Sequence, residues 1–272
     1  MEKNNRFRLK PHEVQVIKDL RSRKVNRLIV GDVHLPYTHK NYLSHCISIY
    51  NKYNCTEVSF TGDILDSHFS SFHSTSTESQ WAKYELDAAI EQVKGWYEAF
   101  PNATITLGNH DLIIARKSEE AGIDKRFVRN LNEVLGCPDW VFEEQFVYDN
   151  VLYTHGTGCS GKGIMKRVQN WGTSMVQGHI HTQCFIDNTA SLTDLKFGVQ
   201  CPTGINYKSF AYAYAKFHTA KPILGCAVIL DNGRLPIIET MPLWKYQKQL
   251  KYLFSIYLLL FLYYTWLFRG AV

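Results

Sequence analysis

The sequence lacks the features that mark several protein classes. Its seven cysteines are scattered over 272 residues and never spaced C-x-x-C, which argues against a zinc knuckle, a dithiol redox motif and a disulfide-stapled small protein. This cysteine usage indicates a reducing compartment. The first thirteen residues, MEKNNRFRLKPHE, contain no apolar stretch of the secretory type. We therefore expect a cytoplasmic protein.

An excess of basic over acidic residues is confined to the N-terminal segment. The net charge is +5, and residues 1–27 carry nine Lys and Arg against three acidic residues. The remainder of the chain is therefore close to neutral, which argues against a broadly basic nucleic-acid-binding surface. With 45% apolar and 20% charged residues, the chain is typical of a globular protein with one large α/β domain or two small ones.

The chain divides into three segments that differ in amino-acid composition. We expect a basic N-terminal extension over 1–25, a domain over 26–245 and a hydrophobic C-terminal tail over 246–272. The extension contains a candidate helix over 12–22, and its basic residues could bind nucleic acid. The alternative, which we favour, is a solvated extension whose helix packs on the domain.

Short β-rich runs alternate with helical patterns in the first half of the domain. Runs at 27–30, 57–60 and 103–107 are separated by candidate helices at 41–53 and 80–99, which predicts βαβ units and a parallel sheet. Later runs are closer together, and the last two indicate antiparallel pairing; they lie at 146–148, 151–154, 174–177, 227–230 and 235–240. The pattern predicts two packed sheets with helices outside.

Polar residues of one chemical kind follow five of these runs. All are oxygen or nitrogen ligands of metal ions, and functional groups gather beyond the carboxyl ends of strands in α/β sheets. The candidate ligands are Asp32, His34, Asp63, Asn109, His155, His179 and His181. Such a mixed set favours Mn²⁺, with Fe or Zn²⁺ as alternatives. Seven ligands exceed the needs of one ion, so we expect two divalent ions that share a carboxylate and act on a phosphoester.

Five blocks in order carry a resemblance to a known family. The blocks are GDVH (31–34), GDILD (62–66), GNHD (108–111), THG (154–156) and GHIH (178–181). Together they resemble the calcineurin-like metallophosphoesterase superfamily. The resemblance covers residues 31–181 and implies a four-layer α/β/β/α sandwich with a dimetal site at the strand carboxyl ends.

The resemblance also implies a role for each residue of the site. The first ion would be held by Asp32, His34, Asp63 and His181, and the second by Asp63, Asn109, His155 and His179, with Asp63 bridging. His110 would stabilise the transition state or protonate the leaving oxygen, and Asp66 or Asp111 would orient it. A hydroxide bridging the two ions would attack phosphorus.

The chain departs from the Ser/Thr protein phosphatases of this superfamily. Leu35 replaces a glycine, Ser67 and His68 stand where an Arg-Gly pair would follow Asp66, and Asp111 replaces a glutamate. The missing arginine argues against a phosphoprotein substrate. GNHD is more similar to phosphodiesterases and double-strand-break repair nucleases, so we expect a nucleotide or nucleic-acid phosphodiester as substrate. The alternatives are a non-catalytic interaction module of the same fold and a membrane-anchored phosphatase.

Two loops near the blocks offer substrate contacts. Residues 156–162 match G-x-x-x-x-G-K, but Gly163 replaces the Ser or Thr of a Walker loop and His155 already belongs to the metal set. We interpret this stretch as a flexible loop that brings Lys162 near a substrate phosphate. The polar stretch 67–79 contains His68, which either contacts substrate or is solvated.

The C-terminal tail has three open interpretations. Residues 252–268 are seventeen residues without a charge, preceded by three lysines and followed by Arg269. This length is at the lower limit for a helix that crosses about 30 Å of hydrocarbon. The tail therefore anchors the chain to a membrane, packs on the domain or a partner, or is an atypical terminus beyond the usual boundary of the family near residues 241–244.

Overall fold

The strands form two sheets among the residues that the computed structural model describes, which are 10, 11, 14, 24–67, 82–192, 194–206, 208–209 and 219–241. The first sheet has the order β11-β10-β1-β2-β3-β4. Neighbours from β1 to β4 are parallel, whereas β10 pairs antiparallel with both β1 and β11. Its strands are β1 (Arg27–Val30), β2 (Glu57–Phe60), β3 (Ala103–Thr106), β4 (Val141–Glu143), β10 (Gly225–Leu230) and β11 (Leu235–Thr240).

The second sheet has the order β5-β6-β7-β9-β8. Its central strands β6, β7 and β9 are parallel, and the edge strands β5 and β8 pair antiparallel with β6 and β9. The strands are β5 (Gln145–Tyr148), β6 (Val151–Thr154), β7 (Ser174–Gln177), β8 (Phe185–Ala190) and β9 (Leu195–Gln200).

Alternation of side chains along the strands packs the two sheets against each other. Leu28 and Val30 of β1 face a helical layer, while Ile29 between them contacts the second sheet. Ile29 packs there with residues of β6 and β7 such as Tyr153 and Val176. The helices over the first sheet are α2 (Tyr42–Lys52), α3 (Ala82–Ala99) and α5 (Leu131–Leu135).

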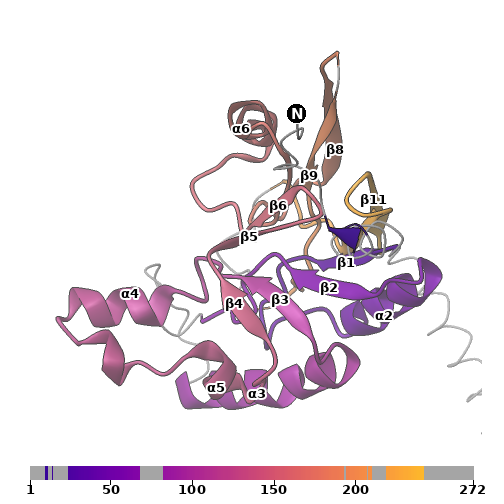
Figure 1. The fold of residues 1–272 in the computed structure, drawn as a ribbon. Helices are drawn as coiled ribbons and strands as arrows, with labels where there is room; N and C mark the ends of the chain where they lie inside the picture. Colours follow the sequence, from indigo (N-terminus) through magenta and orange to yellow (C-terminus); the bar gives the residue numbers. More distant parts are fainter. Residues whose placement is uncertain are drawn as a thin grey trace, which may run out of the picture.

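The outer face of the second sheet is covered by α6 (Ile164–Trp171). Ile164 and Val168 of this helix pack on Leu152 and Met175 of the sheet. Figure 1 shows the layers in order, with α2, α3 and α5 below the first sheet and α6 above the second. The predicted α/β/β/α sandwich is therefore confirmed.

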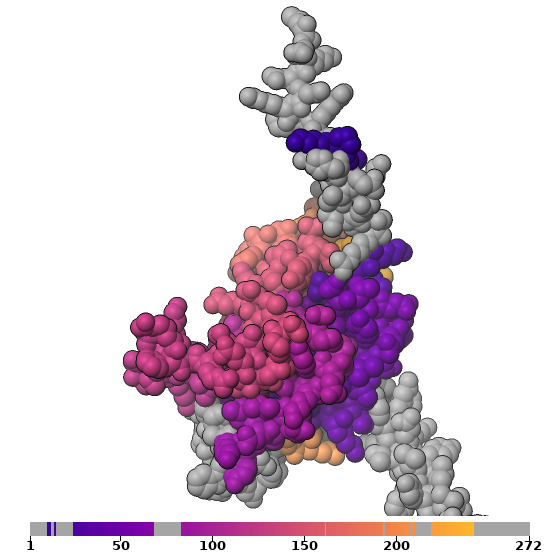
Figure 2. Space-filling model, turned by 60° about the horizontal axis from the view of Figure 1, so that its bottom comes forward, coloured from indigo at the N-terminus to yellow at the C-terminus, as the bar shows by residue number. Residues whose placement is uncertain are grey.

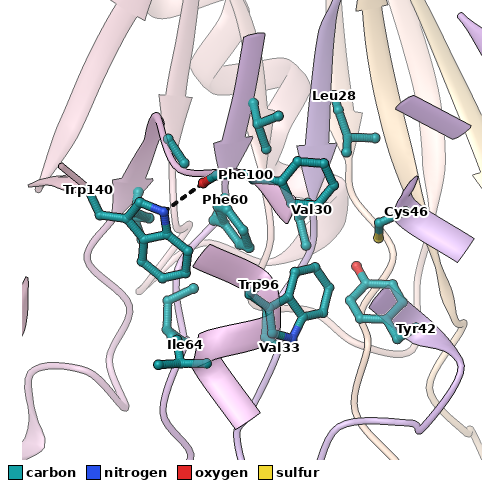
Figure 3. Packing of buried hydrophobic residues seen from close by; sticks show 14 of the residues in the cluster. Leu28, Val30, Val33, Tyr42, Cys46, Phe60, Ile64, Trp96, Phe100 and Trp140 are labelled. Carbon is teal, nitrogen blue, oxygen red and sulfur yellow. Dashed lines mark hydrogen bonds between the residues drawn. The ribbon is translucent and has the colours of Figure 1, made fainter. Parts of the chain in front are cut away.

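Aromatic side chains fill the layer between the first sheet and its helices. Figure 3 shows Trp140, Phe60 and Trp96 packed in one cluster, and the Trp140 indole Nε1 donates a hydrogen bond of 2.9 Å to the Phe100 carbonyl. The centroids of the Phe60 and Trp140 rings lie 5.2 Å apart. This dense layer fixes the strands whose carboxyl ends carry the site.

Several elements differ from the sequence prediction. The structure adds α4 (Ile113–Glu120), α5 and α6, together with β4, β8 and β9. The three helices are short, so few apolar positions mark them. The edge strand β8 has the sequence FIDNTA and no buried residue, so it carries little hydrophobic alternation.

Three of the sequence predictions fall outside the described residues. They are the helix at 12–22, of which the structure describes Val14 alone, the loop at 67–79, of which it describes Ser67 alone, and the tail at 246–272. Within the described part of the chain, no helix has the length and apolar character needed to cross a membrane.

Candidate metal centre

The candidate ligands come from the carboxyl ends of five strands in both sheets. Asp32 and His34 follow β1, Asp63 follows β2, Asn109 follows β3, His155 follows β6, and His179 and His181 follow β7. Because the sheets pack face to face, these ends meet at one edge of the sandwich. The structure brings all seven residues together there.

A first group of four side chains converges on one point. The potential ligand atoms of Asp32, His34, Asp63 and His181 all lie within 4.8 Å of one another. His181 Nε2 lies 3.0 Å from Asp32 Oδ2 and 3.1 Å from His34 Nε2, and His34 Nε2 lies 3.7 Å from Asp63 Oδ2. These four are the residues predicted for the first ion.

A second group meets the first at Asp63. His155 Nε2 lies 3.3 Å from Asp63 Oδ2, 2.9 Å from Asn109 Oδ1 and 3.2 Å from His179 Nδ1. The same Asp63 oxygen therefore faces His34 on one side and His155 on the other. A single carboxylate joins the two groups.

The spacing and the hydrogen bonds of these atoms fit metal ligands. Ligands bonded at about 2.1 Å and about 90° to one another stand about 3 Å apart. His34 Nδ1 lies 2.7 Å from Asp66 Oδ1, and His155 Nδ1 lies 2.7 Å from the Thr61 carbonyl. Both partners are acceptors, so each Nδ1 donates and each Nε2 can direct a lone pair into the group.

The backbone at the ligands adopts conformations that L-residues rarely use. His34, Asp63 and His179 have φ values of 54°, 47° and 71°. Such left-handed residues cost about 1–3 kcal/mol each, and they cluster at functional sites. In addition, a Cβ on Gly108 would lie 2.0 Å from Asp63 Oδ1. Glycine at this position is therefore required for the approach of that carboxylate.

The electrostatics of the cluster favour a cation between the carboxylates and the imidazoles. Burial alone would raise the pKa of Asp63, but the positive charge and hydrogen bond of His155 lower it well below its ordinary value. Burial opposes charge on His155, yet the Asp63 carboxylate raises the pKa of His155 to about 10. The two side chains therefore favour a positive charge between them.

Two supporting residues were missed by the sequence interpretation. The Thr61 hydroxyl donates 2.9 Å to Asp32 Oδ1, while its carbonyl accepts from His155. Thr203 Oγ1 donates 2.8 Å to the Asp32 carbonyl. The position of Thr61 directly before Gly62-Asp63 was visible in the sequence, but Thr203 lies in a loop without a recognisable motif.

The three residues predicted as catalytic have different contacts. His110 lies against His34, with ring centroids 4.8 Å apart, and its Nδ1 bonds to the Asp66 carbonyl. The Asp66 carboxylate instead holds His34. The Asp111 carboxylate accepts from the backbone N–H groups of Leu65 and Gly108. Among the hydrogen bonds of the described residues, Asp66 therefore contacts His110 through its backbone carbonyl. Asp111 connects the turn after β2 to the turn after β3.

The pKa values of two of these residues are shifted. Burial alone would lower the pKa of His110, but the charges of Asp63 and Asp66 raise it. Burial, with the charge of Asp63, raises the pKa of Asp111 to about 7. Both side chains therefore hold protons more readily than exposed residues of their type.

The predicted substrate contacts are only partly described. Lys162 is exposed in the short 3-10 helix η3 (Gly161–Gly163), which precedes α6. His68 lies outside the described residues. The structure therefore places Lys162 on a loop that follows His155, and it gives no position for His68.

A cavity lies beside the centre. The segment with α4 and the 3-10 helix η2 (Lys125–Phe127) projects from the body (Figure 2), and a cavity of about 1370 Å³ lies between it and the start of α3. Leu86, Ile114 and Phe127 line it, and it reaches the centre at Asp111. The seven candidate ligands, all described, are not among its lining residues.

No protein-family model and no curated protein matches this chain. Similar solved structures include vacuolar protein sorting 29 from Cryptosporidium parvum (14% identity, 80% of this chain and 97% of that chain, TM-score 0.42). Another is Vps29 from Chaetomium thermophilum (8% identity, 80% and 95%, TM-score 0.40). A third is the nuclease MPE of Pseudomonas putida (13% identity, 79% and 87%, TM-score 0.32). These three TM-scores are below 0.5, so the likenesses assign no function to this chain.

Proposed function

We propose that this chain is a phosphoesterase that depends on two divalent ions and hydrolyses a nucleotide or nucleic-acid phosphodiester. The observation that carries the proposal is the position of Asp63, whose Oδ2 faces both ligand groups at 3.7 Å from His34 Nε2 and 3.3 Å from His155 Nε2. A shared carboxylate is the arrangement by which two ions are held close enough to act on one phosphoryl group.

The donor set supports the identity of the ions. Asp32, His34, Asp63 and His181 would hold the first ion, and Asp63, Asn109, His155 and His179 would hold the second. These are carboxylate, imidazole and amide ligands, which favours Mn²⁺ and leaves Fe or Zn²⁺ as alternatives. When bound, two such ions lower the pKa of water toward neutrality and neutralise charge on phosphoryl oxygens.

His110 is the residue we assign to the leaving group. Its Nδ1 is used in the hydrogen bond to the Asp66 carbonyl, so a proton delivered to substrate would leave from Nε2. Its backbone N–H donates 2.8 Å to Asp63 Oδ1, which ties the ring to the shared carboxylate. These two hydrogen bonds hold His110 beside the centre, and His110 is not itself one of the proposed metal ligands.

The substrate class follows from the residues around the ligands. The chain resembles the calcineurin-like metallophosphoesterases in its blocks, and it has Ser67 where the protein phosphatases have arginine. This absence and GNHD favour a phosphodiester. Further phosphates of such a substrate could contact Lys162, His68 and the basic segment 1–25. In this proposal the enzyme is cytoplasmic, and residues 252–268 are a candidate membrane anchor.

One assay tests the proposal. The purified Mn²⁺-loaded protein is incubated with chromogenic phosphate mono- and diesters and with single-stranded DNA, beside Asp32→Asn and the exposed control Asp187→Asn of β8. We expect hydrolysis of a diester by the wild type and Asp187→Asn, and loss in Asp32→Asn. No hydrolysis of any substrate by a chain that binds Mn²⁺ would favour the non-catalytic interaction module.

A further inference from the structure

A pair of fully buried amide side chains lies under the loop that carries two of the candidate ligands. Gln177 is the last residue of β7 and Gln200 the last of β9, and the two are direct partners in the parallel register. Both have no solvent exposure. Val176 and Val199 before them face the first sheet, so the glutamines point to the opposite face, toward α6.

Gln200 donates its amide to the loop over residues 178–181. Its Nε2 lies 2.8 Å from the Gly178 carbonyl, 3.4 Å from the Ile180 carbonyl and 3.3 Å from the Cys201 carbonyl. The first two of these carbonyls flank His179 along the chain. The amide therefore contacts the peptide group that precedes His179 and the peptide group that precedes His181.

Gln177 fixes the orientation of that amide. Its Nε2 donates 2.9 Å to Gln200 Oε1, and its own Oε1 accepts from Arg167 of α6 at 3.3 Å. Because Gln200 Oε1 is occupied by a donor, its nitrogen must face the loop carbonyls. The chain Arg167–Gln177–Gln200 thus links α6 to the ligand loop without touching a ligand side chain.

The conformation of the loop shows why it needs support. His179 has a φ of 71°, in the left-handed region that a non-glycine residue rarely adopts. From the side of the centre its backbone N–H donates 2.8 Å to Asp32 Oδ2. Gln200 supplies the hydrogen bonds from the opposite side. The strained residue is therefore held between a candidate ligand above and a buried amide below.

We propose that Gln200 is a positioning residue of the metal centre, which sets His179 and His181 for the ions through the backbone of 178–181. The inference rests on the proposed function. Partners that hold metal ligands in place typically change metal affinity about 10–100-fold when they are removed. Gln200→Met keeps an unbranched side chain of similar length but cannot donate a hydrogen bond. We expect it to weaken Mn²⁺ binding about 10–100-fold.

The experiment compares Mn²⁺ affinity with the stability of the metal-free protein. Mn²⁺ binding is measured by calorimetry, and thermal unfolding is followed without metal, for the wild type, Gln200→Met and Ser174→Ala. Ser174 is the matched control, because it is a buried polar residue at the opposite end of β7 and accepts from the Phe197 N–H at 3.2 Å. Ser174→Ala should lose stability yet bind Mn²⁺ within about twofold of the wild type.

A second variant covers the case in which Gln200→Met does not fold. Gln177→Met removes only the partner that orients Gln200, and we expect a smaller loss of Mn²⁺ affinity, about 3–10-fold. Activity of a folded variant should return at saturating Mn²⁺, because the ligands themselves are intact. The inference is overturned if the folded glutamine variants bind Mn²⁺ as the wild type does. If the wild type itself binds no Mn²⁺, the proposed metal centre fails.

Discussion

Replacement of Gly108 by alanine is the most local perturbation of the centre that the structure allows. Gly108 follows β3, and its φ is not in the left-handed region, so an alanine there is strained only by its neighbours. A Cβ would lie 2.0 Å from Asp63 Oδ1, 2.4 Å from Asp63 N and 2.7 Å from Asp63 Cγ. All three contacts belong to the residue that joins the two ligand groups.

The size of the effect follows from these distances. Real Cβ atoms essentially never approach another atom below 3.0 Å, so Asp63 or the backbone of residue 108 must move by about 1 Å. Metal sites tolerate changes of about 0.2 Å in their ligand distances. Overpacking costs about 1–3 kcal/mol, and loss of the His110 N–H bond to Asp63 adds about 1.5–3 kcal/mol. We expect Gly108→Ala to lose about 2.5–6 kcal/mol of stability and at least about 100-fold in Mn²⁺ affinity.

The control is the same substitution in α3. A Cβ on Gly95 would lie 3.4 Å from Leu43 Cδ2, which is an ordinary contact, and alanine is preferred over glycine in helices by about 1 kcal/mol. Gly95→Ala should therefore raise the free energy of unfolding in urea and leave Mn²⁺ affinity unchanged. A Gly108→Ala variant that is as stable as the wild type and binds Mn²⁺ equally well would refute the expected clash with Asp63.

Three further predictions concern the leaving group, the core and the pH dependence. His110→Ala should keep both ions but lower kcat about 10²–10⁴-fold, and the loss should shrink for substrates with good leaving groups; equal losses for good and poor leaving groups would contradict proton transfer. Trp140→Phe should cost about 2–4 kcal/mol in urea unfolding, because it leaves the buried Phe100 carbonyl without its 2.9 Å donor; a loss below about 1 kcal/mol would contradict this. Burial alone would raise the pKa of Glu239, but the hydrogen bond from Lys52 lowers it below its ordinary value of 4.5. The ionised Glu239 therefore stabilises the fold fully above pH 4.5. This stabilisation is lost as the pH falls through the lower pKa of the folded state. Lys52→Met should raise the pKa of Glu239 in a carboxyl NMR titration, and an unchanged pKa would refute the pairing.

The sequence predicted the layers of the fold because the buried strands carry continuous apolar runs. Leu28, Ile29 and Val30 are buried on both faces of β1, and such runs are recognisable without a structure. The pairing of β1 with β10 could not be predicted, because about 200 residues separate Ile29 from its partner Ala227 and nothing local specifies the contact. The edge strand β8 is too polar to be marked by alternation.

The candidate ligands were predicted because Asp, Asn and His follow a glycine or a threonine at the ends of five apolar runs. Their supports were not, since a threonine or glutamine gives no such signal. Gln177 and Gln200 each end a buried run of residues. A polar residue at the end of an apolar run is the only sign of their hydrogen bonds that the sequence contains. The different contacts of Asp66 and Asp111 could not be predicted either. The Asp66 carboxylate contacts His34 and the Asp111 carboxylate contacts two backbone N–H groups, and the spacing of the residues in the sequence does not reveal this.

The most direct measurement of the central claim is the number of Mn²⁺ ions bound by the wild type and by Asp63→Asn, counted by calorimetric titration of the metal-free protein. The amide introduced by this substitution would keep one oxygen for the His110 N–H, but it supplies neither the charge nor the second oxygen that faces His34 and His155. The shared-carboxylate account predicts two ions per wild-type chain and the loss of at least one in the variant. Two ions bound with unchanged affinity by the variant, or none by the wild type, would contradict it.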